Sequence, residues 1–368
     1  MSWKPHVNCG KLITIQERCS LGGSVVWVDG ATAATRQRLP ASSQYMGEHM
    51  KELIISCDNT MGIPGAEIDD GLALLYLLGR PDVHVRAICC THGNASTAET
   101  YQATVALCQR MGLSDVPVLR GADAGTTLDQ PSDAARYLAA EARRQPGALS
   151  LLSLGATTDL AAAERLDPGT LGRFHEIALM GGMTRTLCVG GRIMDELNFS
   201  VDGQATYEVL GTAHASRSFG LSTESSHLLI ADAHHCLGVA FSTMEFRSRL
   251  IDCMPAAASA RLLDEFCIPW MERAKREWHV DGFVGWDVLA AVALAQPELV
   301  QQLSCRVALN RRFIGSGFLD TSRQTNLSDA LAASVRLVAP VDAASVCEHV
   351  YDAWYQASRA ISRNLATD

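Results

Sequence analysis

Short apolar runs alternate with longer amphipathic segments along most of the chain after residue 50. LIISC (53–57) is followed by DDGLALLYLLG (69–79), and VRAICCTHG (85–93) is followed by STAETYQATVALCQRMG (96–112). Runs of four to eight apolar residues are typical of buried strands, and the longer segments are typical of helices. The same alternation continues through VPVLRG, SDAARYLAAEARRQ, LSLLSLG, TTDLAAAERL and EIALMGG. The pattern predicts an α/β fold with an open, mainly parallel (Rossmann-like) sheet flanked by helices on both faces.

The two ends of the chain differ from this regular part. Residues 1–50 show no sustained period, so we expect an N-terminal extension of unknown role ahead of a main domain at 51–368. After about residue 200 the pattern becomes more helical, with short strands between the helices. The expected helices are VDGQATYEVL (201–210), HCLGVAFSTMEFRSRL (235–250) and VLAAVALAQ (288–296), and the expected strands are RSFGL (217–221) and CRVAL (305–309).

Composition and charge restrict the class of protein. The 368 residues are 48% hydrophobic and carry a formal net charge of −9 without a basic stripe, which argues against nucleic-acid binding. The 12 cysteines are scattered without C-x-x-C pairs or zinc-type spacing, as in proteins that keep reduced thiols. No apolar run is long enough for a membrane span or a secretory signal. We therefore expect a cytoplasmic protein that does not bind membranes.

Acidic side chains follow the ends of the predicted strands. Asp58 follows the first strand, a ten-residue loop comes next, and the pair Asp69 and Asp70 opens the following helix. Asp287 opens a late helix. In parallel sheets, ligands bind at the carboxyl ends of the strands. Helix capping alone would explain Asp69 and Asp70, but carboxylates gathered at one edge repel each other unless a cation such as Ca²⁺ or Mg²⁺ neutralises them.

Several segments together resemble one known family. CDNTMGIPGAEIDDGLALL (57–75) looks like the aspartate-rich motif of the nucleoside hydrolases, usually D-x-D-x-G-x-x-x-D-D-A-L-A-L. Across residues 53 to 355 the other matching segments follow in the family's order. They are the Gly-Asn of THGN, then PVLRGA, SLGATTDLA, IALMGG, DELNFSVDGQA and GWDVLAAVAL.

The resemblance implies the nucleoside hydrolase fold and Ca²⁺-dependent hydrolysis of a ribonucleoside to ribose and free base. In such a reaction the ion holds the ribose 2′ and 3′ hydroxyls and a water, and an aspartate takes the proton of that water. The positions that match the family's metal ligands are Asp58, Asp70, Asp287 and the backbone carbonyl of Thr223. The positions that match its ribose contacts are Asp69, Asn94, Glu196 and Asn198. The resemblance also implies a homodimer or homotetramer that acts on a small nucleoside.

The first motif can be aligned with the family in two registers. In one register, Thr60 stands where most members carry their second Asp, which both ligates the ion and acts as base. Asp58 or Glu67 would then have to substitute. In the other register, Asp58 matches that second Asp and Ser56 matches the first. The spacing from Asn59 to Gly62 favours the first register, and Asp58 is the best candidate base in both.

Trp286 stands immediately before Asp287, where pyrimidine-tolerant members carry a His that is proposed to protonate the leaving base. A Trp there resembles the purine-preferring branch, in which an indole stacks on the base, so Trp286 is a second candidate catalytic residue. A core aromatic is the alternative for Trp286. For the whole protein, the alternatives are a riboside-binding protein with impaired turnover and a hydrolase of a modified riboside selected by the long loop.

Overall fold

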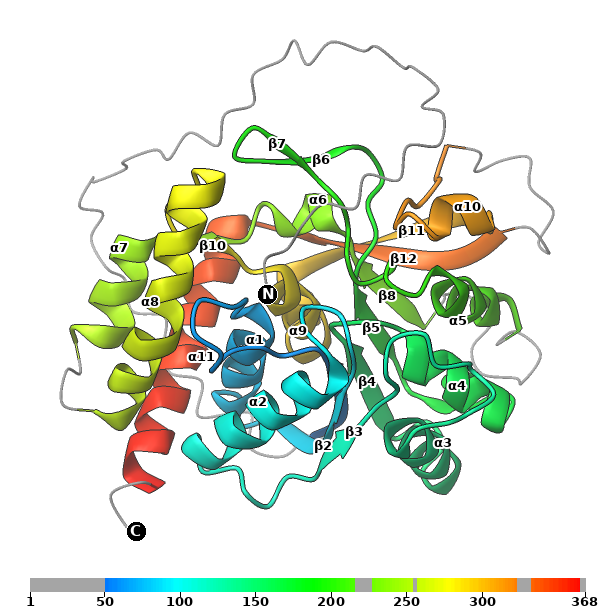
Figure 1. Cartoon of the computed structure of the whole chain (residues 1–368), viewed down its shortest axis with the longest axis horizontal. Helices are drawn as coiled ribbons and strands as arrows, with labels where there is room; N and C mark the ends of the chain where they lie inside the picture. The colour runs from blue at the N-terminus through cyan, green and yellow to red at the C-terminus, as the bar shows by residue number, and fades with distance from the viewer. Residues whose placement is uncertain (1–49, 216–226, 254–256, 323–331, 365–368) are drawn as a thin grey trace. The chain divides into compact units, whose positions relative to one another are not determined.

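The computed structural model describes residues 50–215, 227–253, 257–322 and 332–364. An eight-stranded sheet crosses the molecule (Figure 1). Its strands, in spatial order, are β11 (Val300–Ala308), β12 (Ala332–Pro340), β8 (Leu228–Ala231), β5 (Ile177–Met180), β4 (Leu149–Ser153), β1 (Lys51–Cys57), β2 (Val83–Cys90) and β3 (Val118–Arg120). Seven of them run parallel, and β11 pairs antiparallel with β12. The predicted open, mainly parallel sheet is confirmed.

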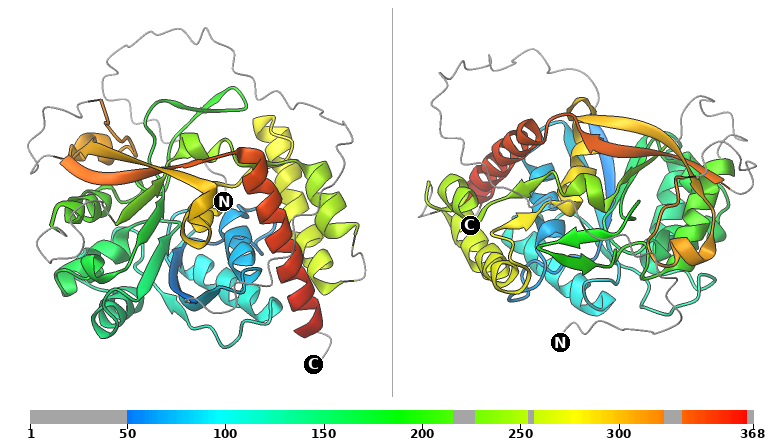
Figure 2. Two further views of the ribbon diagram at one scale, coloured as in Figure 1. Left: turned by 180° about the vertical axis from the view of Figure 1, so that it is seen from behind. Right: turned by 90° about the horizontal axis from the view of Figure 1, so that it is seen from above.

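Helices cover both faces of this sheet. One hydrophobic core contains buried residues of α1, α2, α8, α9 and α11, and a second contains those of α3, α4, α5 and α10. Seen from behind in Figure 2, α11 runs alongside the helices of the first face. The helices are α1 (Asp69–Leu78), α2 (Thr97–Arg110), α3 (Asp133–Arg144), α4 (Thr158–Leu166), α5 (Gly203–Ala215), α6 (Ala233–Cys236), α7 (Thr243–Phe246), α8 (Ala258–Trp278), α9 (Trp286–Ala295), α10 (Arg311–Ile314) and α11 (Ala343–Asn364).

Residues 53–55 of strand β1 show why the centre of the strand is apolar. Successive side chains of a strand point to opposite faces of the sheet. Leu53 and Ile55 accordingly pack in the first core, and Ile54 packs in the second. A strand that is covered on both sides carries charged residues only towards its ends, here Lys51 and Glu52 at its start and Asp58 directly after it.

The order of the strands reverses next to β1. From β1 the chain builds outward through β2 and β3 on one side, and through β4, β5 and β8 on the other. Open parallel sheets bind ligands in the crevice outside the carboxyl ends of the strands at such a switch point. The loops after β1, β2 and β4 therefore mark the part of the molecule where a functional site is expected.

The structure corrects the expected helix at 235–250. This segment contains the short helices α6 and α7, the two-residue strand β9 (Ala240–Phe241) and a single π-helical turn at Arg247–Ile251. Ser242 ends the extended stretch, because its side chain accepts from the Glu245 N–H and caps α7. Strand β9 pairs with β10 (Phe283–Val284).

Two other expectations fall on parts of the chain that are not described. The N-terminal extension lies outside the described residues except for its last residue, and the strand at 217–221 lies outside them completely. The division into an extension and a domain at 51–368 stays a prediction. Within the described ranges, no helix has the length and apolar character needed to cross a membrane.

Candidate active site

Asp58 lies directly after β1, at the switch point. Its side chain is fully buried, and its Oδ2 accepts a 2.5 Å hydrogen bond from the backbone N–H of Asn94 in the loop after β2. The backbone approaches closely on two sides, since a Cβ on Gly93 would lie 2.1 Å from Oδ2 and one on Gly155 would lie 2.8 Å from Oδ1. Among the described residues, Oδ1 has no hydrogen-bond partner. Asp58 thus has one oxygen fixed and one available.

Three further aspartates gather at the starts of two helices. Asp69 and Asp70 open α1, Asp287 is the second residue of α9, and all three are buried. One carboxylate oxygen from each lies within 4.8 Å of the others. The Asp69 carboxylate accepts from the backbone N–H of Asp70 at 3.2 Å and also from that of Asp287. The N-termini of α1 and α9, which carry the positive ends of the helix dipoles, therefore meet at these carboxylates.

Burial raises the pKa of each aspartate in this group. It raises the pKa of Asp58 to about 7, with the charge on Asp69 adding to the effect, and that of Asp69 to about 7. The pKa values of Asp70 and Asp287 are also raised well above the usual range, first by burial and then by the neighbouring carboxylates. Four carboxylates in one buried site are costly without a counter-charge.

The available oxygens fit a hard divalent cation. Asp70 Oδ1, like Asp58 Oδ1, is buried without a hydrogen-bond partner among the described residues. Carboxylate oxygens are the ligands that Ca²⁺ and Mg²⁺ prefer. The sequence predicted that these aspartates converge at one edge of the sheet, and the structure brings them together there.

A fifth carboxylate, that of Glu67, is influenced by the charges of this group, and the sequence named it only as a possible substitute base. Glu67 lies two residues before α1, and its pKa is raised well above the usual range by burial and by the charges of Asp69 and Asp58. Two sequence features pointed to Glu67. The loop between β1 and α1, Asn59–Ile68, is long, and Glu67 is its one acidic residue.

Thr60 is buried at the base of this loop. Its hydroxyl donates a 2.9 Å hydrogen bond to the backbone carbonyl of Glu67. Next to it, the Asn59 side chain accepts from the Met61 N–H at 3.0 Å. The one hydroxyl proton of Thr60 is therefore engaged by the loop, whereas Asp58 shares its electrostatic environment with the other aspartates.

Glu196 and Asn198 lie in the segment before α5 and contact the backbone at the ends of β4 and β5. Both Glu196 oxygens accept from the Phe199 N–H, at 3.2 and 3.0 Å, and burial raises the pKa of Glu196 to about 7. The Asn198 amide donates to the carbonyls of Leu154 and Met180, at 2.8 and 3.3 Å. Leu154 follows β4 and Met180 ends β5, so Asn198 lies at the sheet edge that carries Asp58. Glu196 lies near the same edge, because its carboxylate also accepts from the backbone N–H of Gly182, just after β5. Asn94, by contrast, has an exposed side chain.

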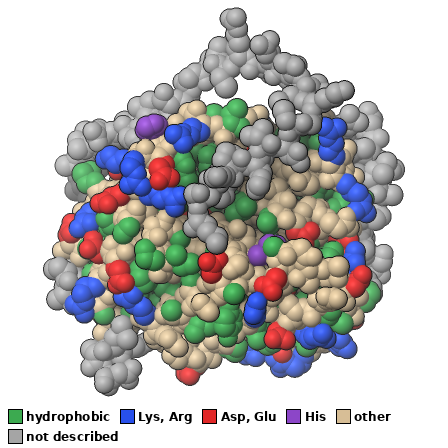
Figure 3. Space-filling model, in the orientation of Figure 1, with side chains coloured by type: hydrophobic (Ala, Val, Ile, Leu, Met, Phe, Trp, Pro, Cys, Tyr) green, Lys and Arg blue, Asp and Glu red, His purple; other side chains and the backbone are tan. Residues whose placement is uncertain are grey.

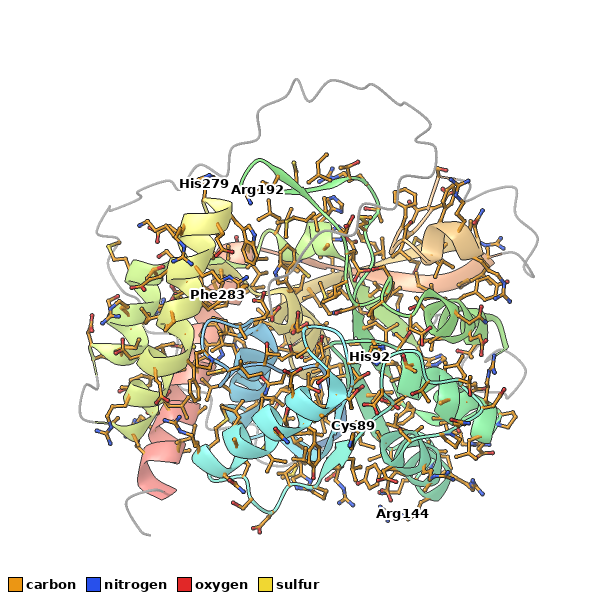
Figure 4. All side chains as sticks on the ribbon, viewed as in Figure 1. Cys89, His92, Arg144, Arg192, His279 and Phe283 are labelled. Carbon is orange, nitrogen blue, oxygen red and sulfur yellow. The ribbon has the colours of Figure 1, made fainter. Side chains whose placement is uncertain are left out.

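Trp286 is half-buried at the start of α9 and contacts a small apolar cluster. This cluster includes Leu187 and Val189 of the hairpin formed by β6 (Leu187–Val189) and β7 (Arg192–Met194). The tip of the hairpin lies against the end of α8, where a Cβ on Gly190 would meet the Trp278 carbonyl. Figure 4 shows Arg192 of the hairpin near His279, the residue that follows α8. Thr223 lies outside the described residues.

A further buried carboxylate, outside the acidic centre, supports the loop after β2 by way of the loop after β3. Asp159 accepts from the Ala122 N–H at 3.0 Å and from the Ser132 hydroxyl at 2.6 Å. The Ala122 carbonyl in turn lies 3.2 Å from Nδ1 of His92 (Figure 4). His92 is two residues before Asn94 in the loop after β2. Sequence reasoning did not single out Asp159, because one acidic residue at a helix start looks like an ordinary capping residue.

Surface charge adds little to this picture. On the face shown in Figure 3, acidic and basic side chains are interspersed over the described residues. Such a surface does not create the single-sign field that steers polyanions.

The fold and the acidic centre define the class of protein, an α/β protein with an oxygen-lined site at the carboxyl edge of a parallel sheet. The chain belongs to the inosine-uridine preferring nucleoside hydrolase family, whose model matches residues 53–348. The predicted membership, the nucleoside hydrolase fold and the assignment as an N-ribosyl hydrolase are thereby confirmed.

Individual relatives agree with this assignment. Uridine nucleosidase 1 of Arabidopsis thaliana is 25% identical over 292 residues, which are 70% of this chain and 78% of that protein. The inosine-uridine preferring nucleoside hydrolase of Crithidia fasciculata is 24% identical over 198 residues, 46% of this chain and 60% of that protein. The purine-preferring ribonucleoside hydrolase from Gardnerella vaginalis shares the fold, with a TM-score of 0.69 and 17% identity over 85% of this chain and 100% of that one.

Proposed function

We propose that this protein hydrolyses the N-glycosidic bond of purine ribonucleosides with the help of Ca²⁺. The observation that carries the proposal is the convergence of Asp69, Asp70 and Asp287, with oxygens within 4.8 Å of one another, beside the buried Asp58. Oxygen ligands alone favour Ca²⁺ or Mg²⁺ over the softer transition metals.

The proposed ion is held by Asp58, Asp70 and Asp287, together with the backbone carbonyl of Thr223. When bound, Ca²⁺ supplies Lewis-acid chemistry, because it lowers the pKa of water and orients hydroxyl groups. The same carboxylates repel one another when no cation is present, and this repulsion favours occupation of the site.

Asp58 is the proposed general base. Its Oδ2 is fixed by the Asn94 N–H, so the partnerless Oδ1 is the oxygen that takes a proton from water. The water oxygen then bonds to C1′ of the ribose while the bond from C1′ to the base nitrogen breaks, and its electron pair leaves with the base. A positioned base contributes about 10²–10⁴-fold to the rate. Asp69, Asn94, Glu196 and Asn198 are the proposed contacts of the ribose.

The preference for purines rests on Trp286. Its half-buried indole precedes Asp287 directly, and a stacked purine presents a larger π surface to it than a pyrimidine does. Stacking also makes the purine ring nitrogen more basic, so that solvent can protonate the leaving base without an imidazole at this position. The names of the relatives include both substrate preferences. The Arabidopsis protein is called a uridine nucleosidase, and the Gardnerella protein is called purine-preferring.

One observation favours a second candidate, a riboside-binding protein with slow turnover. Thr60 is neutral, and its hydroxyl is engaged by the Glu67 carbonyl. If Thr60 occupies the place of the family's base, the protein should bind ribosides and turn them over slowly. Hydrolysis of a modified riboside, selected by the loop 59–68, is a variant of the main proposal.

A panel assay separates these functions. Ribose release is measured from inosine, adenosine, guanosine, uridine, cytidine and modified ribosides with Ca²⁺, with Mg²⁺ and with chelator. We expect release from purine ribosides in Ca²⁺, and we expect Asp129→Asn, which changes an exposed carboxylate, to behave as wild type. Riboside binding without release would instead favour the second candidate.

The cellular setting is also part of the proposal. A reducing, cytoplasmic location fits the ten cysteines of the described residues, all of which are free thiols. The proposed homodimer or homotetramer rests on family resemblance alone, and a monomeric mass in solution would contradict it.

A further inference from the structure

Asp159 holds the loop after β3 at the carboxyl edge of the sheet. It is the second residue of α4, its side chain is fully buried, and its Oδ1 accepts a 3.0 Å hydrogen bond from the Ala122 N–H. The close approach depends on a glycine, since a Cβ on Gly121 would lie 2.1 Å from Oδ2 of Asp159 and 2.4 Å from the Cys90 carbonyl oxygen. The loop after β3 is therefore seated against both the Asp159 carboxylate and the end of β2.

Ala122 connects the loop after β3 to the loop after β2. Its carbonyl oxygen accepts a 2.7 Å hydrogen bond from the Thr97 hydroxyl. The same oxygen lies 3.2 Å from Nδ1 of His92, which acts as the donor because a carbonyl oxygen can only accept. His92 and Thr97 are both buried, and they flank Asn94 along the chain. The stretch that carries the Asn94 N–H is thus fixed on both sides by one carbonyl group.

This path of hydrogen bonds ends at the candidate base. The Asn94 N–H donates to Oδ2 of Asp58 at 2.5 Å. On the other side of the carboxylate, a Cβ on Gly155, in the segment between β4 and α4, would lie 2.8 Å from Oδ1 of Asp58. Asp159 follows Gly155 by four residues. The loops after β2 and β4 therefore both border Asp58, and Asp159 joins these two loops through the loop after β3.

Helix capping does not explain Asp159. The N-cap of α4 is Thr157, whose side chain makes no capping hydrogen bond, and the partners of the Asp159 carboxylate lie on other elements. The second partner is the Ser132 hydroxyl, which donates to Oδ1 at 2.6 Å and also caps α3. Oδ2 is buried without a partner among the described residues, and burial raises the pKa of Asp159. Such a carboxylate is costly to bury, so the free energy of folding does not by itself account for its place.

We propose that Asp159 is a positioning residue that, through the loops after β3 and β2, keeps the Asn94 N–H on Oδ2 of Asp58. The inference rests on the proposed function, because it takes Asp58 as the general base. A fixed donor on one oxygen holds the other oxygen of the same carboxylate in place, and a displacement of about 1 Å at a reacting group can cost about 10²-fold in rate. Asp159 acts by accepting hydrogen bonds, so an asparagine at this position should serve equally.

Hydrogen exchange of the backbone amides of the full-length protein, measured together with kcat, tests this inference. Asp159→Ala removes the acceptor, so we expect the Asn94 amide to exchange at least about 10-fold faster than in wild type. We expect kcat for ribose release from inosine to fall roughly 10- to 100-fold, as loss of a group that orients a functional residue does. Asp159→Asn retains an acceptor oxygen and should keep both quantities within about threefold of wild type.

The matched control is Glu164→Ala, at the other end of α4. The Glu164 carboxylate accepts from the backbone N–H groups of Gly169 and Leu171, at 2.6 and 2.9 Å. The control therefore removes the same kind of hydrogen bond from the same helix, without touching the loops around Asp58. It should lower the melting temperature and leave both the exchange of the Asn94 amide and kcat as in wild type.

Thr97→Val covers the case in which Asp159→Ala does not fold. It keeps the shape of the side chain and removes the hydroxyl that donates to the Ala122 carbonyl, so faster exchange at Asn94 and a lower kcat are expected here as well.

Three results would overturn the inference. They are wild-type exchange and kcat in the folded Asp159→Ala or Thr97→Val protein, equal losses in Asp159→Ala and Glu164→Ala, and equal losses in Asp159→Asn and Asp159→Ala. Each of these leaves an active wild type and the proposed function intact. A wild type that releases ribose from no riboside contradicts the proposed function instead, whatever the exchange of the Asn94 amide.

Discussion

The backbone N–H of Asn94 donates a 2.5 Å hydrogen bond to Oδ2 of Asp58 and thereby ties the loop after β2 to the end of β1. The contact requires a close approach of the two loops, which Gly93 permits because it has no Cβ. It leaves Oδ1 of Asp58 without a partner among the described residues. One hydrogen bond thus sets which oxygen of the candidate base is available.

The first prediction concerns the identity of the base. Asp58→Asn keeps the shape of the side chain but removes its capacity to take a proton, so we expect kcat to fall by about 10²–10⁴-fold with the fold intact. Single-turnover ribose release and circular dichroism provide the measurement and its control.

Thr60→Asp distinguishes the two registers of the first motif. If Asp58 is the base, the added carboxylate should be neutral or harmful because it increases repulsion in the site. If Thr60 occupies the place of the base, the wild type should be slow and Thr60→Asp should raise kcat by up to about 10²–10⁴-fold. An active enzyme that is indifferent to changes at both positions would show that the base lies elsewhere.

The close packing around Asp58 leads to a second prediction. Gly93→Ala would place a Cβ 2.1 Å from Oδ2 of Asp58, so the loop or the carboxylate has to move. We expect a loss of both activity and thermal stability. Gly211→Ala is the matched control, because its Cβ would meet nothing within 4 Å and alanine is the better helix former in α5. Equal melting temperatures and activities for the two variants would contradict the packing argument.

The third prediction concerns the stability of the metal-free protein as pH changes. The pKa of Asp58 and that of Asp69 are raised to about 7 in the folded state, whereas an unfolded aspartate titrates near about 3.9. Between these values the folded state binds more protons than the unfolded state, so stability is present at low pH and is lost as pH rises toward 7. Each extra bound proton makes the slope about 1.4 kcal/mol per pH unit.

Thermal melting from pH 5 to 8 measures this dependence. We expect Tm of the metal-free protein to fall across the range, and saturating Ca²⁺ to flatten the curve because the cation stabilises the ionised carboxylates. Asp70→Asn should reduce the slope, and the exposed Asp129→Asn should not. A Tm that rises with pH in the absence of metal would contradict the assignment of buried, mutually repelling carboxylates.

The fourth prediction is that Trp286 sets the preference for the base. Trp286→Ala should lower kcat/KM for inosine more than for uridine, since stacking is lost mainly for the larger base. Binding of free ribose should change little, because the proposed ribose contacts lie elsewhere in the site. Equal losses for both nucleosides would indicate that the indole serves the core around the β6–β7 hairpin instead.

Sequence alone predicted the parallel sheet because strands buried on both faces carry a continuous apolar signal, as Leu53 to Cys57 do. The prediction of a helix at 235–250 was wrong. The pattern of apolar residues did not reveal the break at Ser242, which depends on a side-chain cap. The convergence of Asp69 and Asp287 follows from their places at helix starts on one sheet edge. The contact between Asn94 and Asp58, and the support from Asp159, depend on the paths of loops, for which a sequence carries no periodic signal.

Ribose release from inosine by one metal-free preparation, before and after addition of Ca²⁺, tests the central claim most directly. Wild type should be inactive in chelator and active after Ca²⁺ is added in excess. Asp287→Ala should stay inactive in both conditions while melting as a folded protein. Undiminished ribose release in chelator, or full activity of Asp287→Ala, would contradict a cation-dependent hydrolase built on these aspartates.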